Sequence, residues 1–173
     1  MASADPLNGL KVSITQSKTS PPTIIATVKN TNSHLVTIAE YQSPFDQLIL
    51  ELGNLAIYPG SGSSSDDSDS STASASNTPL DYPTIRLKRA WPPPKETMVT
   101  LGPGESQTAE IVLRDPVPLR RLGTSATVKL SGQWMSVWRR RAEDIDEADW
   151  DDVSNPDEFS GQYESNSLEI LIA

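Results

Sequence analysis

Hydrophobic and polar residues alternate in short runs along most of this chain. In residues 10–15, Leu10, Val12 and Ile14 alternate with Lys, Ser and Thr, so one face of the segment is apolar. A period of two indicates a β-strand that buries one face. The same test predicts further strands, several of them rich in β-branched residues. They lie over 23–29, 34–39, 54–58, 84–89, 98–101, 108–113, 126–130, 133–138 and 167–172.

Residues 126–138 are predicted to form either two strands or one long strand bent at Gly132. In both arrangements Trp134, Ser136 and Trp138 share a face, which indicates core tryptophans. No stretch has a convincing amphipathic helix pattern, and 142–150 could form at most one helical turn. Seven to nine short strands at about ten-residue spacing predict an all-β fold, an immunoglobulin-like antiparallel β-sandwich.

Charge is distributed unevenly along the 173 residues, which together carry a net charge of −9. Twelve of the 23 acidic residues lie in 61–80 and 143–160, which contain no Lys or Arg, so the rest of the chain is net +3. The first stretch is about half serine and has almost nothing to bury. We therefore expect two disordered acidic insertions, at 60–80 and 142–162. The second directly follows three arginines, 139–141, onto which its carboxylates could fold back.

The length fits one domain, which we expect over residues 9–173 after a flexible N-terminus at 1–8. The chain has no cysteine and one histidine, His34. This composition excludes a disulfide framework, a thiol nucleophile and a zinc site built on sulfur. No pair of acids is marked as catalytic by its surroundings. We therefore expect a protein that is not an enzyme and has no cofactor or metal.

Residues 1–9 contain neither a basic nor an apolar signal region, and no apolar run approaches the roughly 18–20 residues of a membrane span. These absences favour a cytoplasmic protein that does not bind membranes. The negative total charge opposes binding to nucleic acid. We expect a monomer.

Three short motifs follow one another along the predicted sandwich. They are Ala26-Thr-Val-Lys-Asn-Thr31 at a strand end, Ser43-Pro-Phe-Asp46 in a loop, and Val99-Thr-Leu-Gly-Pro-Gly-Glu-Ser106 at a tight turn. In this order they resemble the β-sandwich prodomain of fungal deuterolysin-type zinc endopeptidases, over roughly residues 9–138. The turn is also similar to that of bacterial intracellular proteinase inhibitors. The resemblance implies a stand-alone, non-catalytic module that packs on a peptidase, because the sequence has no His-Glu-x-x-His.

Two loops are the predicted surfaces for partner contact, the second because an aromatic residue beside prolines offers rigid apolar area. The first loop consists of Ser43, Pro44, Phe45 and Asp46, and the second of Trp91, Pro92, Pro93, Pro94 and Lys95. Ser63 and Ser64 each precede an aspartate by three positions, an arrangement that acid-directed kinases favour, so both are candidate phosphorylation sites.

These observations lead to a non-catalytic protein-binding module, most specifically a peptidase inhibitor or a prodomain-like chaperone. Its candidate partner is a zinc endopeptidase. The alternative is a cytosolic regulatory adaptor whose acidic and phosphorylatable loops tune its binding. An acid-based hydrolase ranks third.

Overall fold

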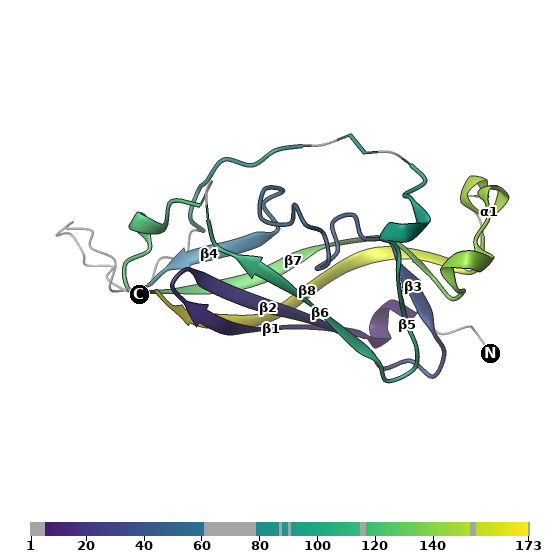
Figure 1. Cartoon of the computed structure of the whole chain (residues 1–173), viewed down its shortest axis with the longest axis horizontal. Coiled ribbons are helices and arrows are strands. Elements are labelled where there is room, and N and C mark those ends of the chain that lie inside the picture. Colours follow the sequence, from purple (N-terminus) through teal and green to yellow (C-terminus); the bar gives the residue numbers. More distant parts are fainter. Residues whose placement is uncertain are drawn as a thin grey trace.

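The alternating segments build two antiparallel β-sheets that lie face to face (Figure 1). The computed structural model describes residues 6–60, 79–86, 88–89, 91–114, 117–152 and 155–172, which contain eight strands. The first sheet has the order β1–β2–β6, with bounds β1 Leu10–Thr19, β2 Pro22–Asn30 and β6 Ser106–Val112. The second has the order β4–β7–β3–β5, with β8 also paired to β7. Its bounds are β3 Val36–Ile38, β4 Leu55–Pro59, β5 Val99–Leu101, β7 Ser125–Trp138 and β8 Glu158–Leu171.

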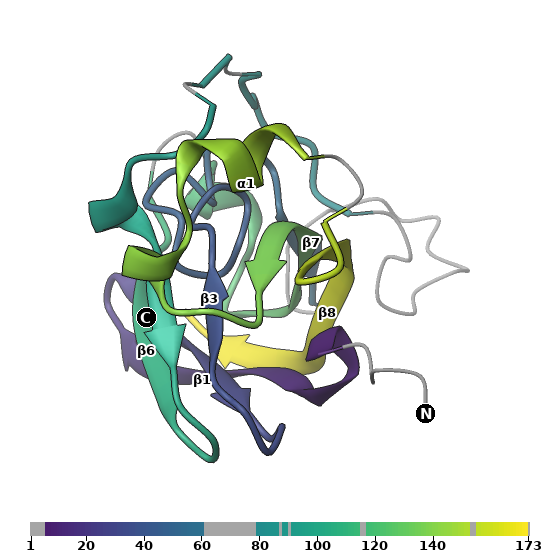
Figure 2. The same cartoon turned by 90° about the vertical axis from the view of Figure 1, so that its right-hand side faces the viewer.

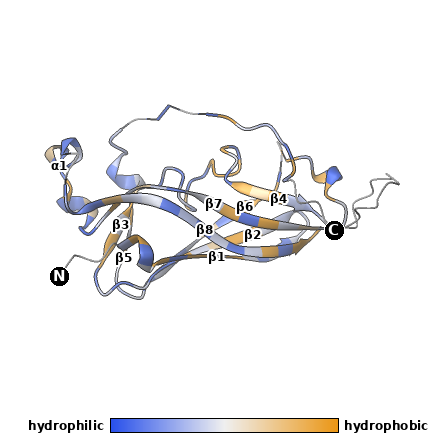
Figure 3. Ribbon diagram, turned by 180° about the vertical axis from the view of Figure 1, so that it is seen from behind, coloured by the Kyte–Doolittle hydropathy of each residue, from blue (hydrophilic) through white to orange (hydrophobic). Residues whose placement is uncertain are grey.

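The apolar face of each strand points into the space between the sheets. Leu10 and Ile14 of β1 are buried, and Ile24, Ala26 and Val28 of β2 are 0 % exposed. Figure 3 shows hydrophobic and hydrophilic colours alternating along the strands. The predicted faces of these two strands and the all-β sandwich are thus confirmed.

One long strand, β7, joins the two halves of the second sheet. It pairs with β4 near its beginning, with β3 near its end and with β8 along its length. A Cβ atom at Gly132 would lie 2.3 Å from Asn54 Nδ2 and 2.8 Å from Tyr163 Oη, so a larger residue here would have to displace these side chains. Trp134 and Trp138 are 1 % and 0 % exposed, as the predicted core tryptophans require.

Two amide side chains connect β1 to β8 and so join the two sheets along one seam. Asn166 accepts from the Ile14 backbone N–H at 2.8 Å and donates to the Ile14 carbonyl at 3.3 Å. Gln16 forms the same reciprocal pair with the backbone of Leu171, at 2.9 and 2.7 Å. Each amide occupies the place that a strand backbone would take in a continuous sheet.

The two sheets also meet at the end of β2. The amide of Asn30, 0 % exposed, donates to the carbonyls of His34, Leu101 and Gly102 at 2.9, 3.0 and 3.1 Å. The Asn30 carbonyl accepts from the N–H of Gly104, which has a φ of 78°, the left-handed region that glycine adopts readily. The strand-end motif and the Gly-Pro-Gly-Glu-Ser turn are therefore in direct contact.

Residues 84–89 are not a strand, contrary to the sequence analysis. The described residues 79–86 and 88–89 have no regular secondary structure, and Ile85 is 45 % exposed. The chain instead runs along the outside of the loops that precede β4, toward the short 3-10 helix η3 (Lys95–Thr97) (Figure 1). We call residues 79–86, 88–89 and 91–95 the crossing segment.

The described parts of the acidic stretch, 142–152 and 155–162, are folded, so the prediction of a disordered loop is wrong for these residues. They contain the 3-10 helix η5 (Ala142–Asp144), the helix α1 (Glu147–Asp151) and the beginning of β8. Arg139 and Arg140, which form ion pairs with Asp149 and Asp157, account for the difference. Residues 61–78 of the other predicted insertion lie outside the described residues. The two other 3-10 helices are η1 (Pro6–Gly9) and η4 (Leu119–Arg121).

Candidate functional site

The loop Ser43–Asp46 is built around a buried carboxylate. Asp46 accepts hydrogen bonds from the backbone N–H groups of Gln42 and Leu48 at 2.7 and 2.9 Å. Arg89 adds a bidentate pair, with Nη1 2.5 Å from Oδ2 and Nη2 2.8 Å from Oδ1. Burial disfavours the charged carboxylate, but these hydrogen bonds outweigh burial and lower the pKa of Asp46 from its ordinary value of 3.8.

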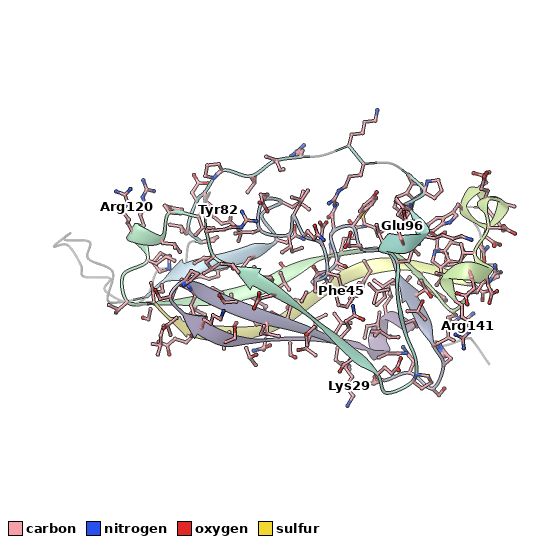
Figure 4. All side chains as sticks on the ribbon, viewed as in Figure 1. Lys29, Phe45, Tyr82, Glu96, Arg120 and Arg141 are labelled. Atoms are coloured by element: carbon pink, nitrogen blue, oxygen red, sulfur yellow. The ribbon has the colours of Figure 1, made fainter. Side chains whose placement is uncertain are left out.

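All four residues of this loop are buried, so the expectation that they form an exposed surface is wrong. Ser43 is 0 %, Phe45 8 % and Asp46 3 % exposed, and Pro44 is also buried. In Figure 4, Phe45 points into the interior of the molecule. The loop turns inward because a serine and an aspartate satisfy its backbone N–H groups, which leaves Phe45 free to enter the core.

Within its described residues, the crossing segment makes polar contacts with the body at four points. Leu80 N–H donates to the Ile57 carbonyl at 2.6 Å, and Ile85 N–H donates to the Glu51 carbonyl at 2.9 Å. Tyr82 Oη donates to the Leu55 carbonyl at 2.8 Å. Burial, assisted by the nearby charge of Glu51, raises the pKa of Tyr82 to about 12. The Arg89–Asp46 pair is the fourth point, so a segment without regular structure still has a defined position.

The second predicted contact loop lies at the end of this segment and is mostly exposed. Trp91 is 47 % exposed, Pro92, Pro94 and Lys95 are exposed, and Pro93 is buried. The surface that the sequence predicts is present here, and partner contact by it stays a prediction. The peptide bond between Trp91 and Pro92 is cis.

Trp91 belongs to a row of four aromatic rings that come from two loops, the helix α1 and the strand β7. Its ring centroid lies 6.4 Å from that of Tyr41 and 5.3 Å from that of Trp150. Trp150 in turn lies 5.0 Å from Trp138, in an edge-to-face arrangement. At the other end of the row, the Arg89 guanidinium stands 4.4 Å above the Tyr41 ring. These contacts fix the rings in orientations typical of aromatic pairs and cation–π pairs.

A pocket of about 420 Å³ opens between the crossing segment and the second sheet. It combines apolar side chains with amides and two arginines. Its lining residues are Tyr41, Gln42, Leu52, Asn54, Ile85, Arg86, Arg89, Trp91 and Met135. Of the three large hydrophobic side chains that are exposed among the described residues, two, Ile85 and Trp91, line this pocket, whereas Leu171 does not. We call it the Tyr41–Trp91 pocket.

The lining of this pocket includes one arginine without a charge partner. Arg86 is exposed and forms no ion pair within the described part of the chain. Arg89, by contrast, is committed to Asp46. Burial and the charge of Asp46 raise the pKa of the neighbouring Glu40, while Arg89 partly offsets this effect.

The sequence that forms this sandwich and pocket matches a known domain family. A family model for an immunoglobulin-like domain matches residues 9–172. The chain belongs to this immunoglobulin-like domain family. A search of curated proteins finds no match. The immunoglobulin-like sandwich of the sequence analysis is thereby confirmed, while the narrower resemblance to a peptidase prodomain stays a prediction.

At one end of this immunoglobulin-like domain, the acidic segment 142–152 and 155–158 folds back on two arginines. Arg140 contacts Asp149 at 2.8 Å and Asp157 at 2.9 Å, and Arg139 contacts Asp157 at 3.4 Å. The backbone N–H of Asp146 and the Arg140 side chain lower the pKa of Asp149. Asp146 and Asp149 form a reciprocal capping box at the start of α1. Figure 2 shows the helical turns lying across the end of the domain that faces the viewer.

Three further features considered in the sequence analysis are a metal site, a membrane span and phosphorylation sites. Within residues 6–60, 79–86, 88–89, 91–114, 117–152 and 155–172, no group of three or more His, Asp or Glu side chains could hold a metal ion. No helix of that same part is long and apolar enough to cross a membrane. Ser63 and Ser64, the candidate phosphorylation sites, lie outside the described residues.

Of the nine residues that line the pocket, the sequence analysis named only Trp91 as a candidate; Tyr41 and Ile85 are among those it missed, and it also missed Trp150 of the ring row. The sequence contained a signal for Trp150. A single tryptophan inside a run of acidic residues is either exposed to solvent or packed against another part of the protein. For Ile85 the alternation was visible but pointed to a strand. Only the packing shows that this side chain faces a pocket rather than the core.

Proposed function

We propose that this immunoglobulin-like domain is a non-catalytic protein-binding module and that it binds through the Tyr41–Trp91 pocket. The observation that supports this most strongly is the exposure of Ile85 and Trp91, 45 % and 47 %, on the rim of one concavity. Adjacent exposed apolar side chains around a pocket mark interaction sites, whereas isolated ones do not. A tryptophan next to prolines also loses little conformational freedom on binding.

The lining indicates the chemistry of the partner. Leu52 and Met135 form apolar walls, and Tyr41 and Trp91 add aromatic faces. Arg86, exposed and without an ion-pair partner among the described residues, lies beside these walls. A protein segment that inserts an apolar side chain and places a carboxylate next to Arg86 fits this combination. The partner therefore has an apolar anchor flanked by an acidic group, and the domain binds it as a monomer.

The narrower proposal, a peptidase inhibitor or prodomain-like chaperone, depends on the three motifs described above. Asn30 and the Gly102–Ser106 turn contact each other, and Asp46 holds Arg89. These motifs therefore organise the fold, and inhibition has to come from the Tyr41–Trp91 pocket or from an exposed loop. A zinc endopeptidase of the deuterolysin type is the enzyme to test, with cleavage of a peptide substrate as the assay.

Affinity capture with three forms of the chain tests the proposed function. The wild-type domain, Ile85→Ala/Trp91→Ala and Leu171→Ala are each used as bait in extract from the source cells. We expect one set of proteins to bind the wild type and Leu171→Ala and to be lost at least about tenfold with the double variant. Leu171 is a matched control because its side chain is 59 % exposed and lies outside the pocket.

Equal capture by all three baits would contradict binding through the pocket. The captured partner should also bind the Arg86→Glu variant more weakly, because that change places a negative charge next to the partner's carboxylate. In the peptidase assay, slower cleavage with the wild type but not with Ile85→Ala/Trp91→Ala would identify the inhibitor. No slowing at a molar excess would exclude it for that enzyme.

A further inference from the structure

Trp150 bridges two tryptophans that belong to different parts of the fold. Its ring lies 5.3 Å from Trp91 of the crossing segment and 5.0 Å from Trp138 of β7, with interplanar angles of 84° and 69°. Both contacts are edge-to-face pairs. We call the space between Trp91 and Trp138 that this indole fills the tryptophan slot.

The residue before Trp150 supplies a charged contact to the same place. Asp149 Oδ2 lies 2.8 Å from Arg140 Nη1, and the Arg140 guanidinium carbon stands 5.9 Å from the centroid of the Trp138 ring. Arg140 therefore offers its charge to a carboxylate while it lies over the ring that receives the indole. An aspartate followed by a tryptophan is the chemistry that this slot holds in the structure.

The fit of the intramolecular segment is incomplete. One buried polar side-chain atom of the rings that form the slot, Trp138 Nε1, has no hydrogen-bond partner among the described residues. Moreover, α1 has only five residues, and Trp150 remains partly exposed. A buried N–H without an acceptor is costly, so an occupant that supplies an acceptor would bind this place better than the chain's own segment.

We propose that the tryptophan slot is a binding site for an acidic segment of a partner protein in which an aspartate precedes a tryptophan, and that residues 146–151 occupy this site intramolecularly. This inference rests on the proposed function, because the slot shares Trp91 with the Tyr41–Trp91 pocket. The acidic segment is then a competitor that the partner displaces, and only partners with both the indole and the carboxylate displace it efficiently.

Intramolecular occupancy lowers the apparent affinity for a partner by the fraction of molecules in which the slot is open. A tethered segment has a high effective concentration, on the order of millimolar for a short connection. Removing the indole and its neighbouring carboxylate should therefore increase the affinity for an added segment, although the change deletes contacts from the folded protein. An ordinary packing role for Trp150 predicts no such gain.

The test uses a synthetic fluorescent peptide with the sequence of residues 143–152 and measures its binding to the full chain by fluorescence anisotropy. The proteins are the wild type, Asp149→Asn, and Asp149→Asn/Trp150→Ala. We expect binding to strengthen in this order, with the double variant at least about tenfold tighter than the wild type. Glu147→Gln is the matched control, since Glu147 is an exposed acid on the same helix with no ion pair inside the described residues, and it should bind as the wild type does.

A second peptide, in which alanine replaces the tryptophan, shows whether the slot recognises the indole, and we expect at least about a tenfold loss with it. Equal binding of both peptides, or equal binding to the wild type and both opened variants, would overturn the inference. So would a concentration-dependent wild-type dimer in sedimentation velocity, because the occupant would then be a second copy. If the opened variants gain no affinity while Ile85→Ala/Trp91→Ala still loses its captured proteins, this inference fails and the proposed function stands.

Discussion

Two aspartate–arginine pairs hold the segments that carry Trp91 and Trp150, and the pairs differ mainly in burial. The Asp46 side chain is 1 % exposed and its partner Arg89 20 %. The Asp149 side chain is 19 % exposed and its partner Arg140 30 %. Asp46 also receives two backbone N–H groups from its own loop, and Asp149 receives one from the start of α1. The same kind of ion pair is thus buried around Asp46 and partly exposed around Asp149.

The difference in burial changes the free energy that is needed to break each pair. A buried charge without its partner is unfavourable, so opening the loop around Asp46 has a large cost in free energy. A surface pair is close to neutral in free energy, so the Asp149–Arg140 pair adds little to the ring contacts that hold this segment in place. One wall of the Tyr41–Trp91 pocket is therefore held firmly in place. The tryptophan slot is instead covered by residues 146–151, which a partner can displace, and we call this segment the exchangeable cover.

The largest expected effect comes from Asp46→Asn. The substitution keeps an acceptor for only one of the two backbone N–H groups and leaves Arg89 without a carboxylate, which should lower the free energy of unfolding by roughly 3 kcal/mol. Urea denaturation followed by tryptophan fluorescence measures this. Asp149→Asn is the matched control, because it makes the same change in the exposed pair. If the two variants lose equal stability, burial does not separate the pairs.

The second prediction concerns the pH dependence of stability, and its effect on the free energy of unfolding cannot exceed that of Asp46→Asn. Because the pKa of Asp46 in the folded protein is below its ordinary value of 3.8, ionised Asp46 stabilises the fold above that pH. This contribution is lost as the pH falls below 3.8 through the folded-state pKa. Thermal unfolding between pH 6 and pH 2 should show a steeper loss of stability for the wild type than for Asp46→Asn. Parallel curves would contradict a lowered pKa.

A smaller effect is expected from Trp150→Ala. The variant loses two edge-to-face ring contacts, each worth about 1 kcal/mol, so the free energy of unfolding should fall by about 2 kcal/mol. Leu171→Ala removes a more exposed apolar side chain without ring contacts and should change stability less. A Trp150→Ala variant as stable as the wild type would show that the ring adds nothing to the folded state.

The smallest effect is expected from Asp149→Asn, whose stability should equal that of the wild type within the error of urea denaturation. Local opening should still increase, because Arg140 loses one of its two carboxylates. Hydrogen–deuterium exchange of residues 147–151 should become faster, while the N–H groups of Gln42 and Leu48 exchange as before. Unchanged exchange in α1 would argue against an exchangeable cover.

Much of the sandwich could be predicted from the alternation of residue types, because each strand buries one face against a single core. Leu10, Ile14 and Trp134 all lie where this pattern puts them. The exceptions have local causes. Residues 84–89 alternate in the same way, but their neighbours hold them outside the sheets through single hydrogen bonds such as that from Ile85 to Glu51.

The candidate site could be predicted only in part. A tryptophan before three prolines indicates an exposed rigid loop, and Trp91 bears this out. The burial of Asp46 could not be predicted, because its partner Arg89 lies 43 positions away in the chain. The same holds for the acidic segment, whose charge density suggests disorder until Arg140 is seen to hold two of its carboxylates. Pairings over such distances are set by the fold rather than by local pattern.

The amides of Gln16 and Asn166 also influence how copies of this domain behave toward one another. A sheet edge normally offers a row of free N–H and C=O groups to any passing strand, which makes it a starting point for aggregation. Along the β1–β8 seam, the backbone groups of Ile14 and Leu171 are already bonded to those two amides. Two uncharged side chains thus protect an edge that other proteins guard with lysine or proline, and their loss would be seen first as self-association rather than as unfolding.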